Sequence, residues 1–123
     1  MIAYTTIGTN DMDRAESFYG ELLAELGAKP NWSSDTFSGF GLGAGQPSFA
    51  ICTPYDGKAA TVGNGTMIAL MAGTKDKVDE MHAKALALGG RDEGAPGVRV
   101  EQFYMAYFRD LDGNKIALYA PVS

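Results

Sequence analysis

The chain has little of what several classes of protein require. Among its 123 residues there is one cysteine, Cys52, and one histidine, His82. A single cysteine excludes a disulfide framework and a four-cysteine zinc site, and it suits a reducing compartment, so the expected location is the cytoplasm. No window approaches the roughly 18 consecutive apolar residues of a membrane-spanning helix. We therefore expect no membrane partner.

Positive charge is also scarce, because 10 Lys and Arg residues stand against 15 Asp and Glu residues, for a net charge of −5. An acidic surface repels phosphate backbones, so we expect no nucleic-acid partner. What is present is a sufficient core, since 46% of the residues are apolar and 11% are aromatic. The length fits one domain over residues 1–123, with a small molecule or another protein as its partner.

Two segments carry apolar residues at three- and four-residue steps, the spacing of an amphipathic helix. The first covers residues 11–26, where Asp11 or the residue before it can cap the start and Gly27 can end the helix in a left-handed conformation. The second covers residues 78–88 and follows Thr74, a candidate N-cap. Two helices of similar length are predicted.

Short β-like stretches surround these helices, and a turn at residues 110–114 joins the last two of them into a hairpin. The predicted strands are Ile2–Thr9, Asn31–Ser34, Thr36–Leu42, Ser48–Thr53, Thr66–Ala72, Phe103–Arg109 and Lys115–Ala120.

The order of the predicted elements indicates an internal repeat. A shift of 63 residues places Ile7 on Leu70, and a shift of 67 residues places Ser48–Ile51 on Lys115–Leu118. We interpret the chain as two βαβββ halves, at about residues 1–56 and 65–121. A glycine-containing connector joins them.

Three segments in this order give the chain its resemblance to a known family. They are Ile7-Gly-Thr-Asn-Asp11 followed by Phe18-Tyr19, then Gly63-Asn-Gly-Thr66, and finally Phe108-Arg-Asp-Leu-Asp-Gly-Asn-Lys-Ile116. The sequence resembles the vicinal oxygen chelate superfamily, which contains glyoxalases, bleomycin resistance proteins and extradiol dioxygenases. The resemblance implies an α+β fold in which two βαβββ units form a curved, mostly antiparallel eight-stranded cup with helices outside. It also implies a homodimer, as in many small members.

Metal-dependent members of that superfamily hold one divalent ion with two histidines and a glutamate. The resemblance places these positions on Tyr4, Met67 and Ala117, of which none is a good ligand for zinc, manganese or iron(II). His82 belongs to the second predicted helix, which the family packs outside the sheet. We therefore expect no metal, no cofactor and no catalytic residue of the family's usual kind.

The expected cavity is apolar and aromatic, and it suits a small organic ligand. If strand alternation holds, Tyr119 points into it with Ala117, and Tyr4 does so with Thr6. Phenols can donate hydrogen bonds while their rings stack on a flat ligand, although plain core packing is the alternative. The candidate ligand-binding residues are Tyr4, Thr6, Trp32, Phe40, Ala50, Cys52, Met67, Tyr104, Ala117 and Tyr119.

Other features have a chemical and a plain interpretation. Glu101 fits a general base or a solvated residue at a strand start, and Arg109 with Lys115 fits an anion contact or solvated hairpin charges. The glycines at every second position of residues 39–45 lack the helix start that a dinucleotide fingerprint needs. They bare one face of a strand, which leaves room for a bend, a close neighbour or a bulky ligand.

The function expected from these observations is binding or sequestration of a small organic ligand without a metal. The alternative is a metal-dependent glyoxalase-like lyase, isomerase or dioxygenase of the same superfamily with an unrecognised ligand set. A third possibility is an interaction module whose cavity is filled by its own side chains.

Overall fold

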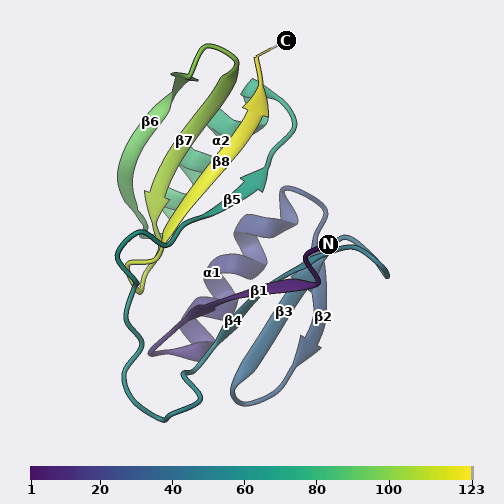
Figure 1. Cartoon of the computed structure of the whole chain (residues 1–123), viewed down its shortest axis with the longest axis vertical. Coiled ribbons are helices and arrows are strands. Elements are labelled where there is room, and N and C mark those ends of the chain that lie inside the picture. The colour runs from purple at the N-terminus through teal and green to yellow at the C-terminus, as the bar shows by residue number, and fades with distance from the viewer. Residues whose placement is uncertain (123) are drawn as a thin grey trace. The chain divides into compact units, whose positions relative to one another are not determined.

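Strand, helix and three further strands follow one another twice along the chain (Figure 1). The computed structural model describes residues 1–122, so residue 123 of the expected domain lies outside them. The elements are β1 Tyr4–Gly8, α1 Met12–Ala24, β2 Lys29–Ser33, β3 Phe37–Gly41, β4 Ser48–Cys52, β5 Ile68–Met71, α2 Lys75–Ala87, β6 Arg91–Arg99, β7 Phe103–Arg109 and β8 Lys115–Pro121.

The eight strands form two sheets of four, in the orders β1-β4-β3-β2 and β5-β8-β7-β6. In each sheet one neighbouring pair is parallel and two are antiparallel, so pairing is mostly antiparallel, as predicted. The repeat holds in the register as well: Ile7 pairs with Ile51, and Leu70 pairs with Leu118. These are the residues that the two sequence shifts matched, and the predicted α+β fold of paired βαβββ units is confirmed.

Each half forms a compact unit of its own. The first unit is Met1–Val62, and the second begins at Gly63. Neither helix within residues 1–122 is long and apolar enough to cross a membrane. The connector is tied to the first unit, because the backbone N–H of Ala60 donates to the side-chain carbonyl of Asn10 at 2.7 Å.

Both helices begin at the predicted caps. The Asp11 carboxylate accepts from the backbone N–H of Arg14 at 3.1 Å, and the Thr74 hydroxyl accepts from Lys77 at 3.1 Å. Each bond satisfies a donor that the first helical turn leaves without a partner. Gly27 ends the first helix with φ +78°. Side-chain chemistry at the termini thus sets where each helix starts.

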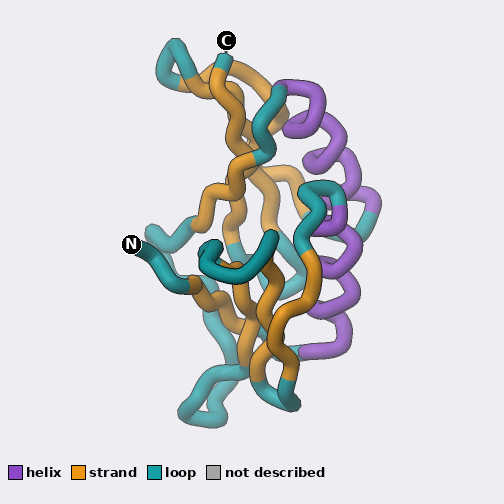
Figure 2. The backbone as a smooth tube through the Cα atoms, turned by 90° about the vertical axis from the view of Figure 1, so that its right-hand side faces the viewer, coloured by secondary structure: helices purple, strands orange, loops and turns teal. Residues whose placement is uncertain are grey.

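The core of each unit lies between its helix and one face of its sheet (Figure 2). In the first unit the rings of Tyr19 and Phe49 lie 4.8 Å apart, and Leu22 of the helix is fully buried. In the second unit, Met81 of α2 and Phe108 of β7 have no exposed surface. The opposite face of each sheet is not covered by the helix of its unit.

The sequence patterns do not predict β6, which is nine residues long. This strand contains Gly94, Pro96 and Gly97, residues that normally interrupt strands. Its pairing with β7 shifts register twice, between Asp92 and Gly94 and between Gly94 and Gly97. Each shift breaks the two-residue alternation by which a strand is recognised. The long pairing with β7 holds this unfavourable sequence in the sheet.

Replacing either of two glycines with alanine should change the free energy of unfolding, in opposite directions. A Cβ at Gly20, inside α1, would meet only a Phe40 ring carbon at 4.0 Å. We expect Gly20→Ala to raise the free energy of unfolding by about 0.5–1 kcal/mol, because glycine is the poorer helix former. A Cβ at Gly90 would lie 2.9 Å from the carbonyl oxygens of Ala85 and Arg109. Because of this clash, Gly90→Ala should lower the free energy of unfolding by about 1–3 kcal/mol.

Urea titration followed by circular dichroism measures both changes. Equal effects of the two substitutions would contradict the packing described around Gly90.

Candidate functional site

The face of the first sheet that points away from α1 carries the candidate site. Phe49 and Ile51 point toward the helix, so strand alternation turns Ser48, Ala50 and Cys52 to the opposite face. The register places Tyr4 beside Ser48, and Thr6 beside Ala50. The same rule turns Phe37, Gly39 and Gly41 of β3 toward this face, where they pair with Cys52, Ala50 and Ser48.

An aromatic hollow of about 420 Å³ lies on this face. Its walls are the rings of Tyr4, Trp32 and Phe37, and the first and last of these meet edge to face at 5.9 Å. Trp32 is 62% exposed and Tyr4 is 59% exposed, which is unusual for rings of this size. The hollow is lined by Ala3, Tyr4, Asn31, Trp32, Phe37, Gly39 and Ser48.

A second hollow, of about 630 Å³, shares the rings of Tyr4 and Phe37 with the first. It is lined by Tyr4, Thr6, Thr36, Phe37, Cys52, Thr53, Pro54 and Tyr55. The two shared rings make one connected surface of both hollows. Such concave apolar surfaces with a few polar groups are the usual form of small-molecule sites.

The polar group of the first hollow is the side chain of Asn31. Its amide N–H donates to the Ser48 hydroxyl at 2.8 Å, so the side chain reaches from β2 across β3 to β4. The crossing depends on glycine: a Cβ at Gly39 would lie 2.7 Å from Asn31 Oδ1, and one at Gly41 would lie 2.7 Å from Nδ2. The glycines of β3 were expected to leave room for a bend, a close neighbour or a bulky ligand. In the structure Asn31 is a close neighbour over Gly39 and Gly41.

The structure brings half of the predicted ligand-binding residues together. Tyr4, Thr6, Trp32, Ala50 and Cys52 lie on the first sheet, on or beside the face with the hollows. Several residues that line the hollows were not predicted, and Asn31 and Phe37 are the ones used below. For Phe37 the signal was available, because it lies two residues before Gly39 and so shares the bared face. Asn31 reaches the site at a register shift in β2, which sequence alternation does not reveal.

Phe40 and Tyr104 stand apart from this surface. Phe40 is 3% exposed and pairs with Phe49 on the helix-covered face, because it lies between two residues that point the other way. The Tyr104 hydroxyl donates to the Asp79 carboxylate of α2 at 2.7 Å, with Lys75 Nζ 5.8 Å from its ring centre. Both aromatic residues belong to the helix side of their sheets.

The remaining predicted residues lie in the second unit. Tyr119 is half-buried, with its ring 5.3 Å from that of Phe103. Ala117 is fully buried, and it pairs with Ala69 and Tyr107. Met67 precedes β5 and is 42% exposed. Tyr119 and Ala117 share one face of β8, as alternation predicted.

The charged candidates are held in local contacts. Arg109 bonds the Glu93 carboxylate at 3.3 Å and the carbonyl oxygen of Gly113 at 3.2 Å. The bond from Arg109 lowers the pKa of Glu93. Lys115 Nζ lies 5.3 Å from the ring centre of Tyr107. Glu101 is an exposed turn residue with φ +62°.

The hydrogen bond from Tyr104 to Asp79 has a testable electrostatic consequence. The bond to the carboxylate raises the pKa of the Tyr104 phenol, because it stabilises the neutral hydroxyl. Any stabilisation is therefore present below the unfolded pKa and is lost as pH rises through the higher folded value. We expect Asp79→Asn to lower this pKa, measured by carbon NMR of the Tyr104 ring. An unchanged titration would contradict the contact.

The residues at the expected metal positions do not fit a divalent ion. Tyr4, Met67 and Ala117 offer a phenol, a thioether and a methyl group, whereas zinc, manganese and iron(II) take imidazole and carboxylate. Among residues 1–122, no group of three or more His, Cys, Asp and Glu side chains is placed to hold a metal. His82 is 6% exposed, with Nε2 3.1 Å from Asp92 and 3.2 Å from the Tyr107 carbonyl oxygen.

Comparisons with known proteins agree on one family. The model of the Glyoxalase/Bleomycin resistance protein/Dioxygenase superfamily matches residues 1–118. A glyoxalase/bleomycin resistance protein from Albidiferax ferrireducens is 35% identical, with a TM-score of 0.87 and coverage of 98% of both chains. Protein ATC0852 from Agrobacterium tumefaciens is 26% identical, with a TM-score of 0.76 over 100% of this chain and 98% of that one.

A lactoylglutathione lyase from the same bacterium is similar in fold, at 22% identity and a TM-score of 0.70, covering 98% of this chain and 92% of that one. No curated protein matches the chain.

Proposed function

The chain belongs to the Glyoxalase/Bleomycin resistance protein/Dioxygenase superfamily, and we propose that it binds a small organic ligand on the aromatic face of its first sheet without a metal ion. The observation that carries this proposal is the hollow walled by the rings of Tyr4, Trp32 and Phe37, of which the first two are exposed. Covering apolar surface contributes about 25 cal/mol per Å². A flat ring between these walls would bury both of its faces.

The absence of a fitting ligand set supports the metal-free part of the proposal. The resemblance puts a phenol, a thioether and a methyl group at the positions of the family's two histidines and glutamate. Binding alone requires no charge to be generated and no proton to be moved, so it needs none of those groups. Sequestration of the ligand is then the whole activity.

Trp32 provides a direct assay, because it is the chain's one tryptophan and it lines the hollow. We expect planar aromatic compounds to change its fluorescence in a saturable way, with one equivalent bound per chain. The protein should first be treated with a chelator. A parallel activity screen with added zinc, manganese and iron tests the metal-dependent lyase, isomerase or dioxygenase alternative.

Two results would overturn this proposal. The first is that no compound of the panel binds, which would favour a module whose surface contacts other proteins. The second is that binding or turnover requires a divalent ion that survives mild chelation.

The proposal includes a homodimer in the cytoplasm. Support comes from the resemblance for the dimer and from the free thiol of Cys52 for a reducing compartment. Light scattering should give twice the mass of the chain. The mass of one chain at high protein concentration would contradict the dimer.

A further inference from the structure

We propose that the ligand is an uncharged planar ring bearing an amide-type edge, an N–H beside a C=O, and that Asn31 is the residue that recognises this edge. The inference rests on the proposed function and names the class of ligand for the same hollow. Its basis is the placement of one primary amide among three aromatic rings, of which those of Tyr4 and Trp32 are exposed.

Asn31 occupies its position because the sheet is irregular there. Pro30 pairs with Phe40 and Trp32 pairs with Gly39, so Asn31 is an extra residue between two paired neighbours. A bulge of this kind redirects a side chain. Here both the amide of Asn31 and the ring of Trp32 line the hollow. The bulge in β2 thus brings both a polar and an aromatic side chain to the hollow.

The amide is held against the sheet by contacts with Ser48, Gly39 and Gly41. The hydroxyl of Ser48 accepts from its N–H at 2.8 Å. The amide lies over Gly39 and Gly41, and a Cβ atom at either position would come within 2.7 Å of one of its atoms. A side chain anchored at its end and laid on glycine loses little further freedom when a ligand binds.

The anchored amide of Asn31 retains hydrogen-bonding capacity. A primary amide has two N–H donors and a carbonyl acceptor. Within residues 1–122 its one hydrogen bond is the donation to Ser48, which leaves one N–H and the carbonyl oxygen for a ligand. These two groups can pair with the C=O and the N–H of a lactam or carboxamide. Two hydrogen bonds of this kind fix both the position and the orientation of a ring.

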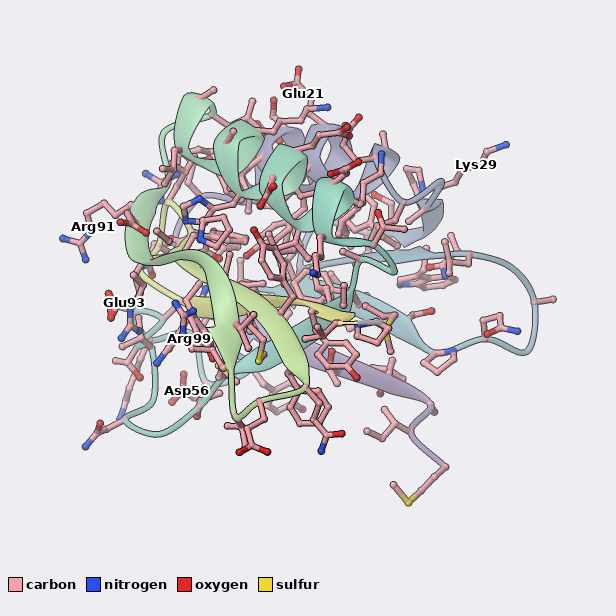
Figure 3. The ribbon with its side chains drawn as sticks, turned by 90° about the horizontal axis from the view of Figure 1, so that it is seen from above. Glu21, Lys29, Asp56, Arg91, Glu93 and Arg99 are labelled. Atoms are coloured by element: carbon pink, nitrogen blue, oxygen red, sulfur yellow. The ribbon has the colours of Figure 1, made fainter. Side chains whose placement is uncertain are left out.

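The charge of the site restricts the ligand further. None of the seven residues that line the hollow is Asp, Glu, Lys, Arg or His. Two charged residues of this unit, Glu21 and Lys29, are exposed and point away from the ribbon (Figure 3). A charged ligand would lose its hydration without gaining a partner, which disfavours carboxylates and ammonium compounds. The class that remains is neutral, flat and amide-edged.

Isothermal titration calorimetry with three probes tests the inference. The probes are 2-quinolone, which has a lactam edge, its N-methyl derivative, which lacks the N–H, and naphthalene, which has the ring shape alone. We expect N-methylation to weaken binding about tenfold, because one hydrogen bond is lost and Asn31 is left unpaired. Quinoline-2-carboxylate should bind at least about tenfold more weakly than 2-quinolone.

The variant Asn31→Leu keeps the branching of the side chain at Cγ and removes its polar atoms. It should reduce the ratio of 2-quinolone affinity to naphthalene affinity about tenfold, while naphthalene binding is retained. The matched control is Asn64→Leu, which changes an exposed asparagine that does not line the hollow and should leave the ratio unchanged.

The outcomes separate this inference from the proposed function. Suppose that naphthalene binds, that N-methylation changes the affinity for 2-quinolone less than about twofold, and that Asn31→Leu changes the ratio of 2-quinolone to naphthalene affinity less than about twofold. Recognition by Asn31 is then wrong, and the aromatic site stands. If no probe binds the unmodified protein, both are wrong. The comparison of 2-quinolone with its N-methyl derivative uses no variant, so a folding defect of Asn31→Leu does not prevent the decision.

Discussion

Replacing Phe37 with alanine is expected to weaken the binding of planar aromatic ligands by about 10- to 100-fold. The ring forms a wall of both hollows and holds Tyr4 in an edge-to-face contact at 5.9 Å. Its removal takes away the apolar surface of one wall and frees the other ring, a combined loss of about 1.5–3 kcal/mol. Naphthalene titrated against the fluorescence of Trp32 measures the change.

Leu42→Ala is the matched control for this prediction. Leu42 is 64% exposed, follows the same strand, and lines neither of the two hollows that share Tyr4. Its replacement should leave naphthalene affinity within about twofold of the original. Equal losses in the two variants would mean that the ligand binds elsewhere on the unit.

The largest expected effect on stability comes from Phe108→Ala. This ring has no exposed surface and lies on the face of its sheet that α2 covers. Truncating a fully buried phenylalanine costs about 3–5 kcal/mol, from lost burial and from the cavity that remains. That is a large part of the 5–15 kcal/mol by which single domains are typically stable. Urea unfolding followed by circular dichroism measures the loss.

Phe103→Ala provides the comparison, because this ring belongs to the same strand and is half-buried on the opposite face. A clearly smaller loss is expected for it. If Phe103→Ala proved the more damaging of the two, the assignment of the core to the α2 side of the sheet would be wrong.

The fold could be predicted where local chemistry and periodicity agree. Asp11 and Thr74 cap the helices as expected, and Gly27 ends the first of them. Strand β7 has the predicted bounds, Phe103–Arg109. These elements carry strong local signals, so their sequence alone identifies them.

The prediction failed where pairing with a neighbour overrides local preference. Strand β6 contains glycines, a proline and charged ends, and it is held in place by β7. No pattern internal to residues 91–99 distinguishes such a strand from a loop. The information that fixes it lies in another part of the chain.

The candidate site shows the same division. Alternation placed Tyr4 with Thr6 and Tyr119 with Ala117 on common faces. Alternation also turns Phe40 to the helix-covered face, because the glycines on either side of it bare the opposite face of the strand. Asn31 could not be found in this way, since a bulge cancels the alternation at the residue that it inserts.

Calorimetric titration of naphthalene into the chelator-treated protein, with and without added zinc, tests the central claim most directly. The account predicts the same affinity and one equivalent per chain in both experiments, because the walls of the hollow supply the binding energy. Loss of binding after chelation, with recovery on addition of zinc, would contradict it.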